Sequence, residues 1–130
     1  MHINARFADL VEERRAGEHQ FVAPYPSKAK RLVWLDVGKV DRSWSTDRGF
    51  YIGRGGTGNT ISDRYARFGE WLKRGEPIRA PDIGLGPSGE VRFGDGRHRF
   101  SVLRDRGVQR MPFYIDRFDA EKARRKFGAG

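Results

Sequence analysis

The stretch VRFGDGRHRFSVLRDRGVQRMPFYI, residues 91–115, contains a complete pattern of strand, turn, helix and strand. EVRF at 90–93 predicts a strand that ends at the glycines of GDG, and the apolar spacing from 97 to about 106 predicts a helix. Gly107 ends that helix, and RMPFYID at 110–116 predicts the next strand. These elements indicate a small domain in which strands and helices alternate.

The turn between the first strand and the helix, GDGRHR at 94–99, has a composition that suits an anion. The first N–H groups of a helix lack partners within it, and the helix dipole places positive charge at this end. Because the dipole disfavours cations there, three consecutive basic residues are better explained by a bound anion than by helix stability. We expect Asp95 to cap the helix and Gly96 to leave room for a phosphate to approach the main chain. The candidate phosphate-binding residues of this turn are Gly94, Gly96, Arg97, His98 and Arg99.

Upstream of this stretch, residues 60–74 predict the clearest helix of the chain. Thr60 and Asp63 stand in the positions of an N-terminal capping box, and we assign the apolar stripe that follows to the core. PIRAPDIGL at 77–85 then predicts a strand that forms a hairpin with 90–93 around the sequence PSG.

The remaining segments are less regular. RLVWLDV at 31–37 predicts the first strand, and we expect 38–59 to be irregular. Its glycine-rich end, GRGGTGN, does not form a P-loop because no Gly-Lys-Ser/Thr follows, so a ligand-covering loop and a plain surface loop both stay open. Short helices are predicted at about 4–16 and at 119–127.

The composition is strongly basic. Lys and Arg total 26 against 17 Asp and Glu, which gives a formal net charge of +9 and a pI of about 10.5. Nucleic acid is a common partner of a small basic domain, although a merely Arg-rich protein from a high-GC genome has the same composition. The absence of cysteine excludes disulfides and thiolate metal sites, and no histidines stand at metal-ligand spacing, so no metal site is predicted. Without a long apolar run or a signal peptide, we expect a cytoplasmic protein with no membrane partner.

Residues from about 60 to 116 resemble the ParB/sulfiredoxin-like superfamily. In that superfamily a strand leads into a D-G-x-H-R or G-E-R-R turn, an apolar helix follows, and a glycine precedes a strand of the "vPv.i" type; VRF, GDGRHR and MPFYI stand in these positions here. FGEWLKRGEPIRAPDI is similar to the preceding helix and strand, and WLDV at 34–37 to the first strand. The resemblance implies a single-domain α+β fold (α/β-type), a small mixed sheet flanked by helices, at 31–116. An N-terminal helix and connector at 1–30 would precede this domain, and a basic helix and tail at 117–130 would follow it.

The resemblance also implies that the turn binds the phosphates of ATP or CTP, with Mg²⁺ bridging phosphate oxygens. The residues that match the motif are Asp95, Gly96, His98 and Arg99. Arg97 stands where sulfiredoxins have their reactive cysteine and ParB proteins a glutamate, which excludes sulfiredoxin activity. In the superfamily a second phosphate-contacting arginine comes from the loop after the first strand, and Arg48 or Arg54 is the candidate here.

Several of these residues have more than one possible role. His98 is a candidate general base, a phosphate donor or a structural residue of the turn, and Asp95 is a helix cap, a magnesium contact or a general base. Glu76, solvated by default, is a further catalytic candidate, because in families of this fold an acid near the nucleotide can take a substrate proton. The basic residues of the last helix suit either a solvated face or contacts with a nucleic-acid backbone: Lys122, Arg124, Arg125 and Lys126.

The predicted function is therefore binding of a nucleoside triphosphate at the turn 95–99, with NTP hydrolysis or phosphotransfer, in a DNA-related plasmid or phage context. One alternative is a small basic nucleic-acid-binding module or ParB-like nuclease. A further alternative is a non-catalytic interaction or inhibitory protein on the same fold.

Overall fold

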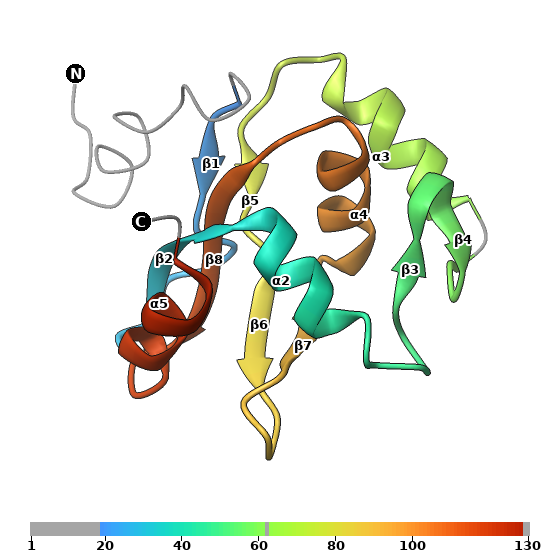
Figure 1. Ribbon diagram of the computed structural model, residues 1–130. Coiled ribbons are helices and arrows are strands. Elements are labelled where there is room, and N and C mark those ends of the chain that lie inside the picture. The colour runs from blue at the N-terminus through green and yellow to red at the C-terminus, as the bar shows by residue number, and fades with distance from the viewer. Residues whose placement is uncertain (1–18, 62, 129–130) are drawn as a thin grey trace, which may run out of the picture.

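A four-stranded mixed sheet forms the centre of the computed structural model, which describes residues 19–128 except residue 62 (Figure 1). The strands follow the order β2-β8-β6-β7, with bounds Lys30–Asp36, Arg110–Asp116, Asp82–Leu85 and Val91–Asp95. β8 pairs antiparallel with β2 and parallel with β6, and β6 and β7 form an antiparallel hairpin. The predicted single-domain α+β fold with a small mixed sheet flanked by helices is confirmed.

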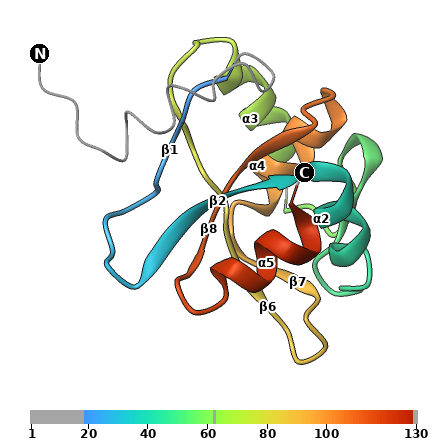
Figure 2. The same ribbon diagram turned by 60° about the vertical axis from the view of Figure 1, so that its left-hand side comes forward.

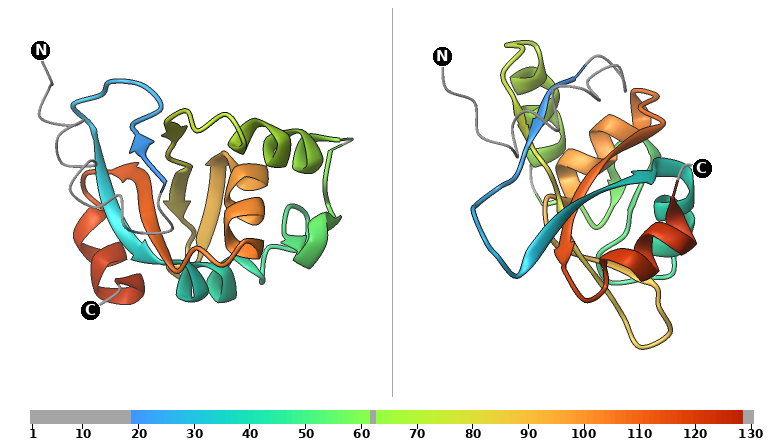
Figure 3. Two further views of the ribbon diagram at one scale, coloured as in Figure 1. Left: turned by 90° about the horizontal axis from the view of Figure 1, so that it is seen from above. Right: turned by 90° about the vertical axis from the view of Figure 1, so that its left-hand side faces the viewer.

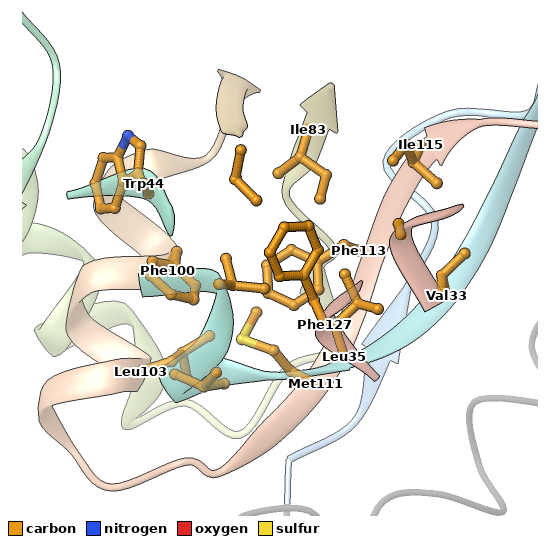
Figure 4. Close-up of a cluster of buried hydrophobic side chains, with 14 of the residues drawn as sticks. Val33, Leu35, Trp44, Ile83, Phe100, Leu103, Met111, Phe113, Ile115 and Phe127 are labelled. Carbon is orange, nitrogen blue, oxygen red and sulfur yellow. The ribbon is translucent and has the colours of Figure 1, made fainter. Parts of the chain in front are cut away.

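One face of this sheet carries the hydrophobic core. Val33 and Leu35 of β2 lie opposite Phe113 and Met111 of β8, and all four side chains are buried because alternate residues of a strand point to the same face. Three helices cover this face: α2 (Val37–Trp44), α4 (Arg97–Asp105) and α5 (Ala120–Phe127). They contribute large buried side chains to the core, among them Trp44, Phe100, Leu103 and Phe127 (Figure 4).

The opposite face of the sheet is covered by the segment that leads into β2. Trp34 of β2 packs edge-on against Phe21 at 6.1 Å between ring centroids, and the Tyr114 hydroxyl donates to the Tyr25 carbonyl at 2.6 Å. Phe21 belongs to β1 (Phe21–Val22), which pairs in parallel with β5 (Ile78–Arg79). The sheet is thus enclosed from both sides, with α2 and α5 on the side away from β1 (Figure 3).

The segment 38–59, predicted to be irregular, contains a helix and a small hairpin. α2 begins after Asp36, whose side chain accepts from the Lys39 N–H at 2.8 Å, and it buries Val37, Val40 and Trp44 along one side. β3 (Ile52–Gly53) and β4 (Thr57–Gly58) then form a hairpin around the short 3-10 helix η1 (Arg54–Gly56). The prediction was wrong for α2 because the glycine-rich end of the segment obscured the short apolar pattern at its start.

The helix α3 is shorter than predicted, spanning Arg64–Leu72, and it packs beside α4. The predicted capping box does not form: the Asp63 side chain makes no cap hydrogen bond and instead pairs with Arg67 at 3.3 Å. The strand predicted at 77–85 is divided into β5 and β6, which belong to different sheets. The break falls at Ala80, whose N–H donates to the Val22 carbonyl, and at Pro81, which has no N–H to donate.

The strand predicted at 110–116 and the helices predicted from 97 and at 119–127 are confirmed as β8, α4 and α5. The helix predicted at 4–16 lies outside the described residues. In the described part of the chain no helix has the length and apolar character needed to cross a membrane.

Candidate functional site

A cavity of about 400 Å³ lies between α3, β5, the end of β7 and the start of α4. Four arginines line it, Arg64, Arg67, Arg79 and Arg99. Asp95 is the one carboxylate that lines it among the described residues. α3 and α4 lie side by side and apart from α5, so the cavity is separate from the basic C-terminal helix (Figure 2). Its charge favours an anionic ligand.

The start of α4 differs from the predicted capped turn. Asp95 is the last residue of β7, and the N-cap of α4 is Gly96, in the left-handed conformation with φ 85°. The first N–H of α4 to bond within the helix is that of Phe100, which donates to the Gly96 carbonyl at 2.9 Å. Since a glycine N-cap supplies no side-chain acceptor, the preceding N–H groups add positive potential beside the cavity.

Arg99 is the most enclosed arginine of the cavity. Its Nε donates to the Arg79 carbonyl at 3.0 Å, and its Nη2 lies 3.7 Å from an Asp95 carboxylate oxygen. Nη2 is buried and has no hydrogen-bond partner among the described residues. Burial lowers the pKa of the Arg99 guanidinium, and Arg79 lowers it further against the opposing effect of Asp95. A buried donor of this kind is costly unless a partner binds it.

The absence of a side chain at Gly96 allows Arg99 and Pro81 to pack closely against its α-carbon, and it does not create open space for a ligand. A β-carbon at this position would come within 2.7 Å of Arg99 Nη2 and 3.0 Å of the Pro81 α-carbon. The expectation that this glycine leaves room for a phosphate is thus corrected, because the Arg99 guanidinium occupies the space beside its α-carbon.

His98 lines the cavity but has a structural partner. Its buried ring accepts the Ile61 N–H at Nε2, at 3.0 Å, and so joins the start of α4 to the segment that precedes α3. Burial, with the nearby Arg97 and Arg64, lowers the pKa of His98 below its ordinary value of 6.5. The neutral ring therefore carries its proton on Nδ1, and Nε2 is engaged by the main chain rather than free to act as a base.

Since the pKa of His98 is lower in the folded chain than in the unfolded one, the Ile61–His98 hydrogen bond is expected to stabilise the fold only in the neutral form. This contribution is complete above pH 6.5, the ordinary value, and is lost as the pH falls through the folded-state pKa. Chemical denaturation between about pH 5 and 8 measures it, with His98→Gln as the control, because the glutamine amide oxygen can accept the same N–H without titrating. An equal pH dependence in both proteins would contradict the prediction.

Arg97, the third basic residue of the turn, does not line the cavity. Its Nη1 donates to the carbonyls of Phe50, at 3.1 Å, and Asn59, at 2.6 Å, and its guanidinium lies over the Phe50 ring at 5.4 Å from the centroid. Asn59 in turn donates to the carbonyls of Arg48 and Tyr51. Arg97 thus fixes the loop that precedes β3 and the segment that follows β4.

The other predicted site residues lie outside the cavity. Gly94 lies within β7, facing Asp82, and Arg48 is exposed on the loop that Asn59 holds. Arg54 is exposed and lies 3.8 Å from Asp105, and Glu76 is exposed and lies 3.7 Å from Arg74. Of the predicted catalytic and phosphate-binding residues, the cavity brings together Asp95, Gly96, His98 and Arg99.

The basic residues of the last helix lie on a separate surface. α5 packs against β2, and all four of its predicted nucleic-acid contacts are exposed: Lys122, Arg124, Arg125 and Lys126. Lys126 donates to the Gly89 carbonyl at 3.2 Å, and Arg124 pairs with Glu121 at 3.0 Å.

Three arginines of the cavity were not predicted: Arg64 and Arg67 of α3 and Arg79 of β5. In the sequence, the spacing 64, 67, 71 and 74 places three arginines and Trp71 along one side of a predicted helix. This pattern could have indicated a basic helix face at the site. Phe68 and Trp71 also line the cavity, with rings stacked at 5.5 Å and an interplanar angle of 16°. The apolar stripe predicted for the core began at Ile61 and included Phe68; Phe68 packs partly buried against the core, but the prediction was wrong for Ile61, which is exposed.

No group of three or more His, Asp or Glu side chains among the described residues could hold an ion. A magnesium ion in this cavity would depend on oxygens that its ligand supplies.

Comparison with known proteins bears on the fold. No protein-family model matches the chain, and no curated protein matches it. A solved structure that matches is that of an oncogenic suppression activity protein, described as a plasmid fertility inhibition factor, with a TM-score of 0.64 and 18% sequence identity. The match covers 85% of this chain and 63% of the other, so the chain spans less than two thirds of that protein. At this identity the likeness shows a shared fold.

Proposed function

We propose that the cavity binds a nucleoside triphosphate, ATP or CTP, in a cytoplasmic protein with a ParB/sulfiredoxin-like domain. The observation that carries the proposal is a cavity lined by four arginines and one carboxylate, in which the Arg99 guanidinium lies 3.7 Å from Asp95. The phosphates would contact the arginine guanidinium groups that line the cavity and the N–H groups at the start of α4.

The dimensions and charge of the cavity support a ligand of this class. Its volume of about 400 Å³ falls in the range of small-molecule sites, and its four arginines face one carboxylate. A triphosphate would satisfy an excess of positive charge that a neutral ligand would leave uncompensated. Asp95, Gly96, His98 and Arg99, the residues that match the superfamily motif, all line this cavity.

Nucleotide binding has more support than hydrolysis of the nucleotide or phosphotransfer. Mg²⁺ would enter with the nucleotide, and Asp95 is the residue of the cavity that could contact it. The ion would neutralise charge on the phosphate oxygens. Of the predicted catalytic groups, His98 accepts a main-chain N–H and Glu76 lies outside the cavity, which leaves Asp95 as the candidate base for hydrolysis or phosphotransfer.

The plasmid or phage context is part of the same proposal. The protein with a similar fold is described as a plasmid fertility inhibition factor, and a role in plasmid fertility inhibition is the setting that we propose here. In that setting a nucleotide-binding domain would act as a regulatory or inhibitory component, whether or not it turns the nucleotide over.

Isothermal titration with ATP and with CTP, each with and without Mg²⁺, tests the proposal. We expect saturable one-to-one binding of at least one nucleotide, weakened by added salt because the contacts are ionic. Absence of binding at millimolar concentrations of both nucleotides would overturn it.

A second candidate function is contact with a nucleic-acid backbone through α5, where four basic side chains are exposed within five residues. Such binding would fall steeply with salt and would not need nucleotide. A gel-shift series with Lys122→Glu/Arg125→Glu separates it from the cavity, since these changes should leave nucleotide binding intact.

A further inference from the structure

A second hollow, of about 500 Å³, adjoins the cavity on the outer side of α3. Arg67 and Trp71 line both spaces, so these two side chains form the border between them.

The two spaces differ in charge. The cavity is lined by four arginines and one carboxylate, whereas the outer hollow is lined by Arg67 and Arg74 together with Asp63 and Glu70. Arg67 lies 3.3 Å from Asp63, which further balances the charge there. A phosphate is favoured in the cavity, and an uncharged polar group is favoured in the outer hollow.

Trp71 presents a rigid aromatic surface at the border. Its indole stacks on the Phe68 ring at 5.5 Å with an interplanar angle of 16°, and both rings pack partly buried against the core. A side chain held in this way loses little conformational freedom when a second flat ring stacks on it. In proteins that bind single-stranded nucleic acids, bases stack on aromatic side chains, and arginines add a cation–π contribution.

We infer that Trp71 is the base-stacking residue of a nucleotide whose phosphates lie in the arginine-lined cavity and whose base lies in the outer hollow. This inference rests on the proposed function, and it places the phosphates in the cavity and the base in the outer hollow. Since stacking uses the π-face that every base has, the subsite accepts different bases, with base-edge contacts left to the polar rim of Asp63 and Glu70.

The test compares ATP with inorganic tripolyphosphate, which has the phosphates without the base. In the unsubstituted protein we expect ATP to bind more tightly than tripolyphosphate. Trp71→Leu should weaken ATP binding about 5- to 150-fold, the range found for loss of base–aromatic stacking, and leave tripolyphosphate binding unchanged. Trp71→Phe should retain most of the ATP affinity while losing the tryptophan fluorescence quenching that ATP causes.

Unchanged tripolyphosphate binding also shows that the variants are folded. Phe118→Leu is the matched control, because Phe118 is an exposed aromatic residue outside both spaces, and it should leave both affinities unchanged. Equal affinities for ATP and tripolyphosphate, both unaffected by Trp71→Leu, would overturn the stacking inference while phosphate binding stood. Failure of both ligands to bind would overturn the proposed function and the inference with it.

Discussion

Replacing Arg104 by leucine is expected to lower the free energy of unfolding by about 3–5 kcal/mol, the range for removing one partner of a buried ion pair. Arg104 lies in α4 with a side chain only 2% exposed, and it donates to Asp41 at 2.9 Å and to Asp105 at 2.8 Å. Its Nη1 also donates to the Ile52 carbonyl at 2.7 Å. Leucine would fill much of the space but would remove the hydrogen bonds that Arg104 donates to two carboxylates and a carbonyl.

The expected loss of stability is large because Asp41 and Asp105, the partners of Arg104, also bind other elements of the fold. Burial opposes ionisation of Asp105, but hydrogen bonds from Arg104, the Tyr65 hydroxyl and the Gly55 N–H outweigh it, so the pKa of Asp105 lies below its ordinary value. Burial likewise opposes the charge of Arg104, and its bonds to Asp105 and Asp41 outweigh that effect and raise the pKa of the guanidinium. The network therefore joins α2, α3, α4 and the β3–β4 hairpin through ionised groups.

Urea denaturation of Arg104→Leu measures the loss, with Arg106→Leu as the control. Arg106 is an exposed arginine two residues further along the chain, and its replacement should change stability by no more than about 0.5 kcal/mol. Similar destabilisation by the two substitutions would mean that the ion-pair network of Arg104 does not stabilise the fold more than an exposed arginine does.

The sequence predicted the C-terminal half of the fold well because its local signals agree with one another. β8 has the predicted bounds, 110–116, since an apolar and aromatic run is followed by an acidic residue and a turn. α4 begins at Arg97 as predicted because a glycine with positive φ precedes it, and Gly107, also at positive φ, follows its end.

Elements that depend on distant partners were less predictable. β5 and β6 read as one strand, and only the pairing of Ile78 with Phe21 and of Asp82 with Tyr114 shows that they belong to different sheets. Two-residue strands such as β1 and β5 carry too little pattern to be recognised on their own.

Only part of the candidate site was predicted from the sequence, and the reason is geometric. Successive residues of a helix point about 100° apart, so Arg97, His98 and Arg99 cannot all face one ligand. Arg99 lines the cavity, His98 lines it while binding the Ile61 N–H, and Arg97 turns to the loop carbonyls. Arg64 and Arg79 come from elements distant in sequence, and no local signal connects them with the turn.

Replacing Arg99 by alanine is expected to weaken nucleotide binding about 10- to 150-fold, which corresponds to the 1.5–3 kcal/mol of a hydrogen bond to a charged group. The Arg99 guanidinium lines the cavity 3.7 Å from an Asp95 carboxylate oxygen, and it packs against Gly96 and Pro81. The fold should persist, since among the described residues the substitution removes one hydrogen bond, to the Arg79 carbonyl, and the 3.7 Å ion pair with the exposed Asp95.

Arg97→Ala is the matched control for this substitution. It removes the same charge from the same helical turn, yet Arg97 binds the Phe50 and Asn59 carbonyls and does not line the cavity. A long-range electrostatic effect would weaken nucleotide binding equally in the two variants, whereas a ligand held by the Arg99 guanidinium loses affinity mainly in Arg99→Ala. Isothermal titration of both variants at two salt concentrations separates these cases, because salt screens the long-range part and leaves the contact at the buried guanidinium largely intact. Equal losses that vanish together at high salt would therefore remove Arg99 from the binding site.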